Sequence, residues 1–333
     1  MRRHLPTQRA ALLIAVLVLG GCGDASAEGV PLGAASSATG PESGGLTAER
    51  AGVVLSAFDQ ADSAASSTGD IEGLRLQETS PALDFSVAAV RRAAHHQRQQ
   101  PAFRHVNPGF ALPTGAASCF LVVATLQLSG AELAPTVVSQ FVESDGTWKL
   151  SHNVRVSQEA VIGARGVGGT VAGPAEQLLD VASRQALAGE VFARTIGSST
   201  GNRALVDPGA LLDEQFAAGW SLYQQQLAGT GVQVDREFTG AQWGPCAAST
   251  SAGTVTFLTL YATDVLVPAP DGAATVTLPP ESFDLIALGR TEPASGSRIE
   301  VSRVETFLLL IPESGSGATV LGLNDTAIAI DIS

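Results

Sequence analysis

Lysine is nearly absent from this chain of 333 residues, in which the single Lys149 accompanies 18 arginines. Basic side chains number 19 against 32 acidic ones, so the formal net charge at pH 7 is −13. A nucleic-acid-binding surface needs basic side chains to neutralise phosphates, and anionic membrane faces attract basic segments for the same reason. The composition therefore argues against nucleic acid as a partner and disfavours broad adhesion to an anionic membrane.

Several catalytic and cofactor motifs are also missing. The sequence has no His-Glu-x-x-His, no Ser-x-x-Lys, no P-loop, no calcium loop and no Cys-x-x-Cys. The adjacent His95 and His96 would diverge by about 100° on a helix, so they do not form a chelating pair. We therefore expect a protein that is not an enzyme, with no catalytic residue, no metal site and no cofactor, although groups distant in sequence can converge in a fold.

Long apolar runs are confined to the amino terminus. Three arginines precede an uninterrupted apolar run over residues 10–19. As a helix this run spans about 15 Å, half of a hydrocarbon core, which is typical of a secretory signal and too short for a membrane span. The segment Leu19-Gly20-Gly21-Cys22 resembles the bacterial lipobox. The resemblance implies that residues 1–21 are cleaved off as a signal peptide and that Cys22 carries a diacylglyceryl group; an ordinary signal peptide is the alternative.

Two acyl chains on Cys22 would hold the protein at the extracytoplasmic face of the cell membrane, with the lipid as its membrane partner. Residues 22–46 would then form the anchor and a flexible tether, because they are small and polar and lack apolar periodicity. Cleavage removes three arginines and no acid, which leaves 16 basic against 32 acidic residues. The expected product is a strongly acidic body on a lipid anchor.

Cysteine is scarce as well, with three in the whole chain. Once Cys22 is assigned to lipid, Cys119 and Cys246 remain as an even pair in an oxidising compartment. We expect a disulfide between them, which would close a long loop and stabilise the fold by about 4–5 kcal/mol on a chain-entropy model. Two buried free thiols are the alternative.

Hydrophobic periodicity predicts two α+β domains, over residues 47–160 and 174–333, joined by a glycine-rich linker at 161–173. In the first domain we expect helices over residues 47–66 and 81–96, the second with Ser80 as its N-cap. After Pro101 the period changes to two, which predicts strands and a hairpin about residues 144–147. The returning strand would place one set of side chains on one face: Trp148, Leu150, His152, Val154 and Val156.

The second domain repeats the order of the first. Helical segments at 174–195 and 208–227 precede predicted strands at 232–238, 254–263, 298–311 and 319–332. Residues 119–125 and 141–146 are locally similar to residues 256–263 and 311–315, and an insertion within residues 266–297 would account for the different offsets.

Helices followed by a curved antiparallel sheet, with an aspartyl-glycyl turn before Trp148-Lys149-Leu150, resemble the nuclear-transport-factor-two-like (cystatin-like) α+β fold. The resemblance implies two such cone-shaped domains in tandem, and the whole arrangement is similar to an uncharacterised actinobacterial lipoprotein family.

Two groups of polar residues could form a site. His152 is the one polar side chain on its predicted strand face; in a cone it could transfer protons, whereas the simpler interpretation is a buried, hydrogen-bonded histidine. Four arginines lie in residues 85–131, a segment without any acid. They could bind an anion such as a phosphate, or those on the helix could only complement its dipole. These arginines are Arg91, Arg92, Arg98 and Arg104.

Trp220 and Tyr223 are spaced three apart on a predicted helix, so they could line an apolar pocket or belong to ordinary core. Taken together, the patterns predict a non-enzymatic binding, assembly or sensing module of the cell envelope, with an unknown envelope protein as partner. A carrier of a small apolar ligand or lipid, held in a cone-shaped pocket, is the alternative. A cone-site enzyme that uses His152 is the third hypothesis.

Overall fold

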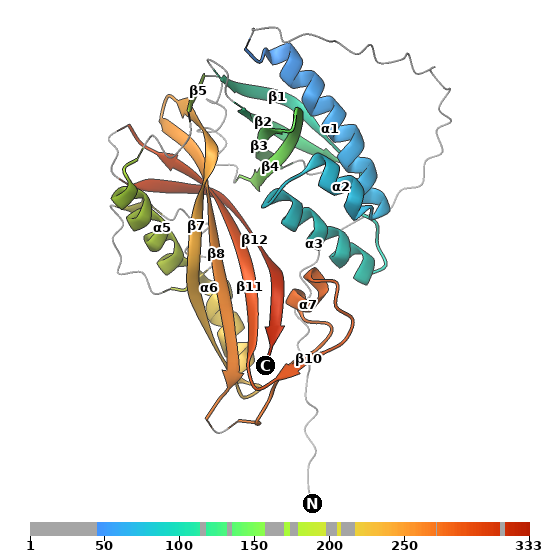
Figure 1. The fold of residues 1–333 in the computed structure, drawn as a ribbon, viewed down its shortest axis with the longest axis vertical. Helices are drawn as coiled ribbons and strands as arrows, with labels where there is room; N and C mark the ends of the chain where they lie inside the picture. Colours follow the sequence, from blue (N-terminus) through green and yellow to red (C-terminus); the bar gives the residue numbers. More distant parts are fainter. Residues whose placement is uncertain are drawn as a thin grey trace, which may run out of the picture.

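The computed structural model describes residues 45–113, 118–131, 135–156, 170–173, 179–197, 205–207, 217–270, 272–313 and 317–333. Cys22, the predicted signal peptide and nearly all of the predicted tether lie outside these ranges. Within them, no helix combines the length and apolar character that crossing a membrane would require. The described chain has an α+β fold in which helices lie against antiparallel strands (Figure 1).

Three helices precede a four-stranded antiparallel sheet in the first half of the chain. The elements are α1 (Ala48–Thr68), α2 (Ile71–Gln77), α3 (Ala82–His95), β1 (Phe103–Pro113), β2 (Cys119–Leu128), β3 (Thr136–Ser144) and β4 (Thr147–Arg155). The Thr47 hydroxyl caps α1 by accepting a hydrogen bond from the Arg50 N–H at 3.2 Å. Apolar side chains of α1 pack on β2 and β3, so the helices cover one face of this sheet (Figure 1).

Two details of these helices differ from the prediction. The short helix α2 has no counterpart in the sequence analysis, because seven residues are too few for a helical period to stand out. Ser80 is not the N-cap of α3; that position is Pro81, which makes no side-chain capping bond. The Ser80 side chain instead hydrogen-bonds to Asp84.

The β3–β4 hairpin turns where the sequence predicts it. Asp145 and Gly146 have φ values of 52° and 74°, and Ser144 pairs with Thr147 across the turn. Positive φ at both central residues is the geometry whose twist suits a two-residue hairpin, and aspartate followed by glycine adopts it readily.

The predicted face of β4 is wrong because the strand contains a bulge. Gln140 pairs with His152 and Phe141 with Leu150, so Ser151 is an extra residue on β4. Leu150 consequently packs with the core beneath α1, whereas Val154 packs against the second sheet. One added residue moves all later side chains to the opposite face.

The second half contains helices on the outside of a long-stranded sheet. The elements are α5 (Val181–Thr195), β6 (Val206–Asp207), α6 (Ala217–Ala228), β7 (Val232–Thr250), β8 (Gly253–Pro268), β9 (Val276–Leu278), α7 (Phe283–Ala287), β10 (Ala294–Gly296), β11 (Ile299–Ile311) and β12 (Ala318–Ile332). The four predicted strands are confirmed, and three of them are longer than predicted. The insertion expected within 266–297 corresponds to β9, α7 and β10.

Each half ends in an antiparallel meander of four main strands, β1-β2-β3-β4 and β7-β8-β11-β12. The locally similar segments 119–125 and 256–263 lie on the second strand of each meander. Residues 141–146 include the end of the third strand of the first meander, and Ile311 is the end of the third strand of the second; residues 314 and 315 lie outside the described ranges. These placements are compatible with duplication, which stays a prediction.

Strand β5 (Thr170–Gly173) connects the two meanders. It pairs parallel with β1 and antiparallel with β7, which gives one ten-stranded sheet in the order β4-β3-β2-β1-β5-β7-β8-β11-β12-β6. The last four residues of the expected linker are therefore a strand, and residues 157–169 lie outside the described part of the chain.

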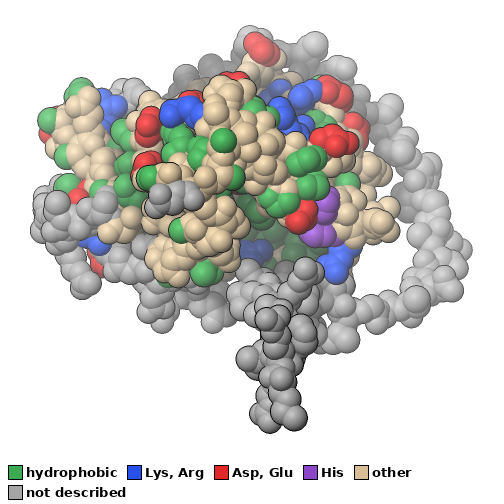
Figure 2. Space-filling model, turned by 90° about the horizontal axis from the view of Figure 1, so that it is seen from below, with side chains coloured by type: hydrophobic (Ala, Val, Ile, Leu, Met, Phe, Trp, Pro, Cys, Tyr) green, Lys and Arg blue, Asp and Glu red, His purple; other side chains and the backbone are tan. Residues whose placement is uncertain are grey.

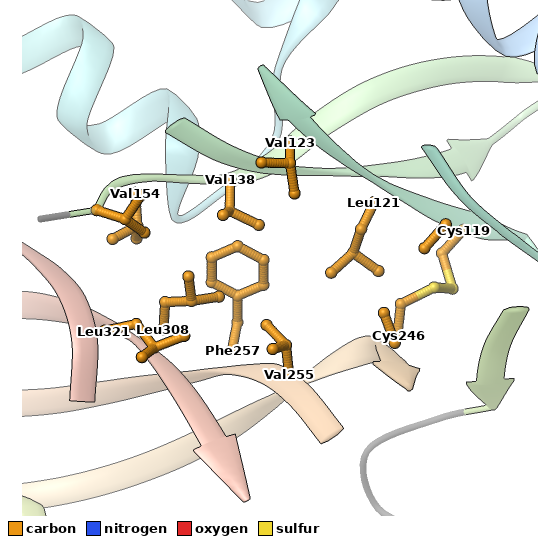
Figure 3. Close-up of a cluster of buried hydrophobic side chains, with 13 residues drawn as sticks. Cys119, Leu121, Val123, Val138, Val154, Cys246, Val255, Phe257, Leu308 and Leu321 are labelled. Carbon is orange, nitrogen blue, oxygen red and sulfur yellow. A yellow bond between two sulfur atoms is a disulfide. The ribbon is translucent and has the colours of Figure 1, made fainter. Parts of the chain in front are cut away.

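The meanders also pack face to face around a shared hydrophobic core. Figure 3 shows side chains of the first meander pointing toward those of the second: Leu121, Val123, Val138 and Val154 toward Val255, Phe257, Leu308 and Leu321. The predicted disulfide between Cys119 and Cys246 lies at one end of this core, with the two Cα atoms 6.1 Å apart. The two halves therefore form one body with a covalent bond between their sheets.

Candidate functional site

A hollow of about 300 Å³ lies between α6, α7 and the long strands of the second half. We call it the aromatic–ionic pocket. Its lining consists of Gly219, Trp220, Tyr223, Arg236, Phe283, Asp284, Arg303 and Asp325. Its size is at the lower end of the range for small-molecule sites.

Helix α6 contributes the two aromatic residues that the sequence singled out. Trp220 and Tyr223 lie one turn apart with ring centroids separated by 5.8 Å, and Trp220 is 7% exposed. The helical spacing of three residues brings both rings to the same side of α6. Phe283, from the inserted helix α7, adds a third ring that is half exposed.

Two arginines at the base of the pocket are bound by four carboxylates. Arg236 donates to both oxygens of Asp264 at 2.5 and 2.9 Å and to Glu305 Oε1 at 2.6 Å. Arg303 donates to Asp284 Oδ1 at 2.6 Å and to both oxygens of Asp325 at 3.2 and 2.9 Å. Each bidentate pair fixes a guanidinium plane, so the network holds the pocket wall in one geometry.

Burial and ion pairing act against each other in this network. Burial lowers the pKa of Arg303, but the surrounding carboxylates of Asp325, Asp284 and Asp264 outweigh that effect and raise it overall. Burial raises the pKa of Glu305 to about 7, although Arg236 opposes the shift. Burial also raises the pKa of Asp284 against the opposing effect of Arg303.

The aromatic rings of the pocket already interact with cations. The guanidinium carbon of Arg236 lies 4.3 Å from the Trp220 ring centroid, and that of Arg92 lies 4.8 Å from the Phe283 centroid. Both distances fall within the range of cation–π attraction. Because Arg92 belongs to α3, the first half of the chain contributes to the surroundings of this pocket.

The four arginines predicted to bind an anion do not converge. Arg91 Nη1 donates to the carbonyl of Ala287 at 3.3 Å, and Arg92 lies over Phe283, so both serve the contact between α3 and α7. Arg104 donates to Gln127 on the surface, and Arg98 is exposed. Figure 2 shows histidine side chains at the surface next to a basic side chain. Among the described histidines, His95 and His96 are the exposed ones.

His152 lies in the core between the sheets. It lines neither the aromatic–ionic pocket nor the second hollow of the molecule, which lies between α1 and β1. It is 3% exposed and stacks on Phe257 with ring centroids 4.8 Å apart. Its Nδ1 lies 3.2 Å from Gln140 Nε2 and 3.0 Å from Ser151 Oγ, and its Nε2 lies 3.3 Å from Thr259 Oγ1. Burial lowers the pKa of His152 to about 3, so it is neutral at pH 7.

A larger hollow, of about 560 Å³, lies between α1 and β1 and is called the α1–β1 groove. Strand β5 pairs with Leu112 and Pro113 of β1, and within the described ranges no other strand pairs with the rest of this β1 edge. Side chains of α1 take that place: Ser63 Oγ accepts from the Phe103 N–H at 2.9 Å and Asp59 Oδ2 from the His105 N–H at 2.8 Å. Asp59 Oδ1 also lies 2.6 Å from His105 Nδ1.

Sequence reasoning missed both the ionic network and this groove. Asp59 and Ser63 are spaced by four on a helix, which was the one local signal for the groove. The paired residues of the aromatic–ionic pocket come from β7, β8, α7, β11 and β12. No local motif can reveal groups that meet only through the sheet register.

Two further arrangements lack the context that chemistry would need. Within the described ranges, His, Cys, Asp and Glu side chains nowhere gather in threes or more so as to hold a metal ion. Residues 197–201 have the Gly-x-Ser-x-Gly spacing of a hydrolase nucleophile elbow. That motif acts between a strand and a following helix, whereas this one follows α5, and residues 198–201 lie outside the described part.

Comparison with known sequences and structures adds a family but no activity. The sequence model of a family described as a domain of unknown function, DUF8094, matches residues 43–330. No curated protein matches the chain. The chain is similar to the crystal structure of the intermembrane space region of chloroplast protein ARC6, with 10% identity over 45% of this chain and 98% of that one. The TM-score is 0.24, too low to support an argument about fold.

Proposed function

The chain belongs to the DUF8094 family, whose description gives no activity. We therefore propose from the geometry of the structure that it is an exported, lipid-anchored, non-enzymatic binding protein. Its ligand site is the aromatic–ionic pocket. The observation that carries this proposal is a preformed hollow whose guanidinium nitrogens each already donate to a carboxylate beside three aromatic rings. Such a site is organised to hold a ligand. Among its described lining residues the groups that could act as a nucleophile or base are Tyr223, Asp284 and Asp325, and the two acids already accept hydrogen bonds from Arg303.

Export and anchoring are supported by two independent features. The lipobox-like segment ending at Cys22 provides the attachment point. The Cys119–Cys246 disulfide suits an oxidising compartment outside the cytoplasmic membrane. We place the body at the extracytoplasmic face of the cell membrane, on the tether of residues 22–46.

We further propose that the two halves are related cone-type domains of one actinobacterial lipoprotein family. The recurrence of helices followed by a four-stranded meander supports this relation. Carriage of a wholly apolar ligand fits the pocket less well, because four of its eight lining residues are charged.

Native mass spectrometry of the full-length protein purified from its host tests the binding function. We expect a small molecule in stoichiometric amount that is lost from the Trp220→Ala variant. A matched control is Trp148→Ala, which removes a tryptophan from the core beneath α1 and leaves the pocket lining intact. Absence of any ligand from the wild-type protein, or equal loss in both variants, contradicts a binding role for this pocket.

A further inference from the structure

We propose that the aromatic–ionic pocket selects a small organic cation, meaning an ammonium group carried on an apolar or aromatic body. This inference rests on the proposed function, because it specifies the ligand class of the same pocket. A cationic ligand differs from the apolar ligand that the spacing of Trp220 and Tyr223 on α6 alone would suggest.

The first step concerns hydrogen-bonding capacity. All three nitrogens of Arg236 and all three of Arg303 already donate to carboxylates. These bonds use three of the five N–H groups of each guanidinium, so hydrogen-bonding capacity alone does not exclude an anion. A cation can also be bound, because each carboxylate oxygen can accept a second hydrogen bond. Asp284 and Asp325 both line the hollow and can do so directly.

The second step concerns charge. Four carboxylates surround the two guanidiniums of the network: Asp264, Asp284, Glu305 and Asp325. Even when Glu305 carries a proton, three carboxylates remain against these two arginines, and Arg92 over Phe283 then balances the third. The lining itself contains two acids and two arginines, and the two arginine side chains are only 5% and 8% exposed, so the preference depends on which charged group a ligand can reach. Asp325 has a side-chain exposure of 22%, the highest of the four acids, so a ligand can reach it.

The third step concerns the aromatic rings. Arg236 and Arg92 show that the faces of Trp220 and Phe283 attract cations in this environment. Aromatic rings combined with carboxylates are a recurrent way to recognise ammonium groups. Tyr223 adds a third ring, and its hydroxyl lies 3.5 Å from Asp284 Oδ2. Burial raises the pKa of Tyr223, so this hydroxyl keeps its proton.

Calorimetric titration of the full-length protein in a neutral detergent tests the ligand class. The probes are benzyltrimethylammonium, benzyl alcohol and benzoate, which share a ring and differ in charge. We expect the ammonium probe to bind about tenfold or more tightly than the alcohol, and benzoate not to bind. Equal or tighter binding of the alcohol or of benzoate overturns the inference.

Two variants locate the binding. Asp325→Asn should weaken the ammonium probe about tenfold, whereas Asp331→Asn, an exposed position on the same strand, should not change it. If Asp325→Asn disturbs folding, Phe283→Leu replaces it, because Phe283 is 53% exposed and its loss removes one ring from the wall. That variant should weaken the ammonium probe several-fold and leave the alcohol unchanged.

The outcomes separate the inference from the proposed function. If the ammonium probe fails to bind while native mass spectrometry finds a ligand that depends on Trp220, the cation preference is wrong and the binding role stands. If the probe fails and no ligand copurifies, both are wrong. If Asp325→Asn and Asp331→Asn behave alike, the cation is not held at this pocket.

Discussion

The buried acids in the two halves of this protein differ in their partners. In the first half, Asp62 and Glu78 are each 2% exposed, and within the described ranges no arginine or lysine pairs with either. Burial, followed by the charge of Asp59, raises the pKa of Asp62 to about 7, and burial raises that of Glu78 well above its ordinary value. In the second half, buried acids surround Arg236 and Arg303.

The difference shows why the larger hollow is the weaker candidate. The polar groups of the α1–β1 groove accept hydrogen bonds from backbone N–H groups of β1, and Asp62, a buried acid on α1 that is not among the groove's lining residues, favours its neutral form. Burial also raises the pKa values of Asp284 and Glu305 in the second half, but Arg303 and Arg236 oppose these shifts and pair with both acids. A ligand can therefore contact charged side chains held in fixed positions in the smaller hollow, and this difference from the groove can be tested experimentally.

The largest effect is expected from removing a buried guanidinium. Arg303→Met leaves Asp284 and Asp325 without their partner and should destabilise the fold by about 3–5 kcal/mol. Arg298→Met is the matched control, because Arg298 forms an exposed pair with Glu300 and should cost less than about 1 kcal/mol. Denaturant unfolding measures both. Equal costs would mean that the buried network does not maintain the second half.

A smaller loss is expected from the groove. Asp59→Ala leaves the His105 N–H and ring without their acceptor and should cost about 2 kcal/mol in unfolding free energy. Gln60→Ala, at an exposed position that also lines the groove, should change stability by less than about 0.5 kcal/mol. Neither substitution should alter binding of the ammonium probe. A loss of binding in Asp59→Ala with the fold intact would make the groove the functional site.

The pH dependence of stability separates neutral from charged acids. Because the folded pKa of Asp62 is raised, its stabilising contribution is complete below its ordinary value of 3.8 and is lost as pH rises toward about 7. Asp62→Asn removes this term, so its stability should fall less steeply between pH 4 and 7 than that of wild type, by at most about 1.4 kcal/mol per pH unit. His152 acts in the opposite direction, because its lowered pKa costs stability as pH falls below 6.5. It is present in both proteins and cancels in the comparison, and identical slopes would show that Asp62 is ionised in the folded state.

No effect on the fold is expected from the anchor. Cys22→Ser should move the protein from the membrane fraction to the soluble fraction and leave its unfolding midpoint unchanged, because the residue precedes both hollows and the shared core. Fractionation after a salt wash measures the release. A variant that still sediments with membranes would remove the lipid-anchor assignment.

The sequence predicted those features that a short stretch of chain determines. Asp145 and Gly146 located the β3–β4 turn, and the pairing of Cys119 with Cys246 followed from counting cysteines. The spacing of Trp220 and Tyr223 put two rings on one side of α6, where they line the pocket.

The missed features depend on register and edges. The bulge at Ser151 reverses the faces of β4 without any local marker. The partners of Arg303 lie on α7 and β12 and meet it only because the sheet and the inserted helix align there. Asp59 has the sequence context of an ordinary helical acid, and its role as an acceptor depends on a stretch of β1 that no described strand covers.

A crystal structure of the protein with bound benzyltrimethylammonium would show which hollow binds the cation, because both hollows are visible in one experiment. We expect the ammonium group in the aromatic–ionic pocket, within about 6 Å of an aromatic ring centroid and beside the carboxylates of Asp284 and Asp325. Ordered ligand in the α1–β1 groove, with the aromatic–ionic pocket filled only by water, would contradict this expectation.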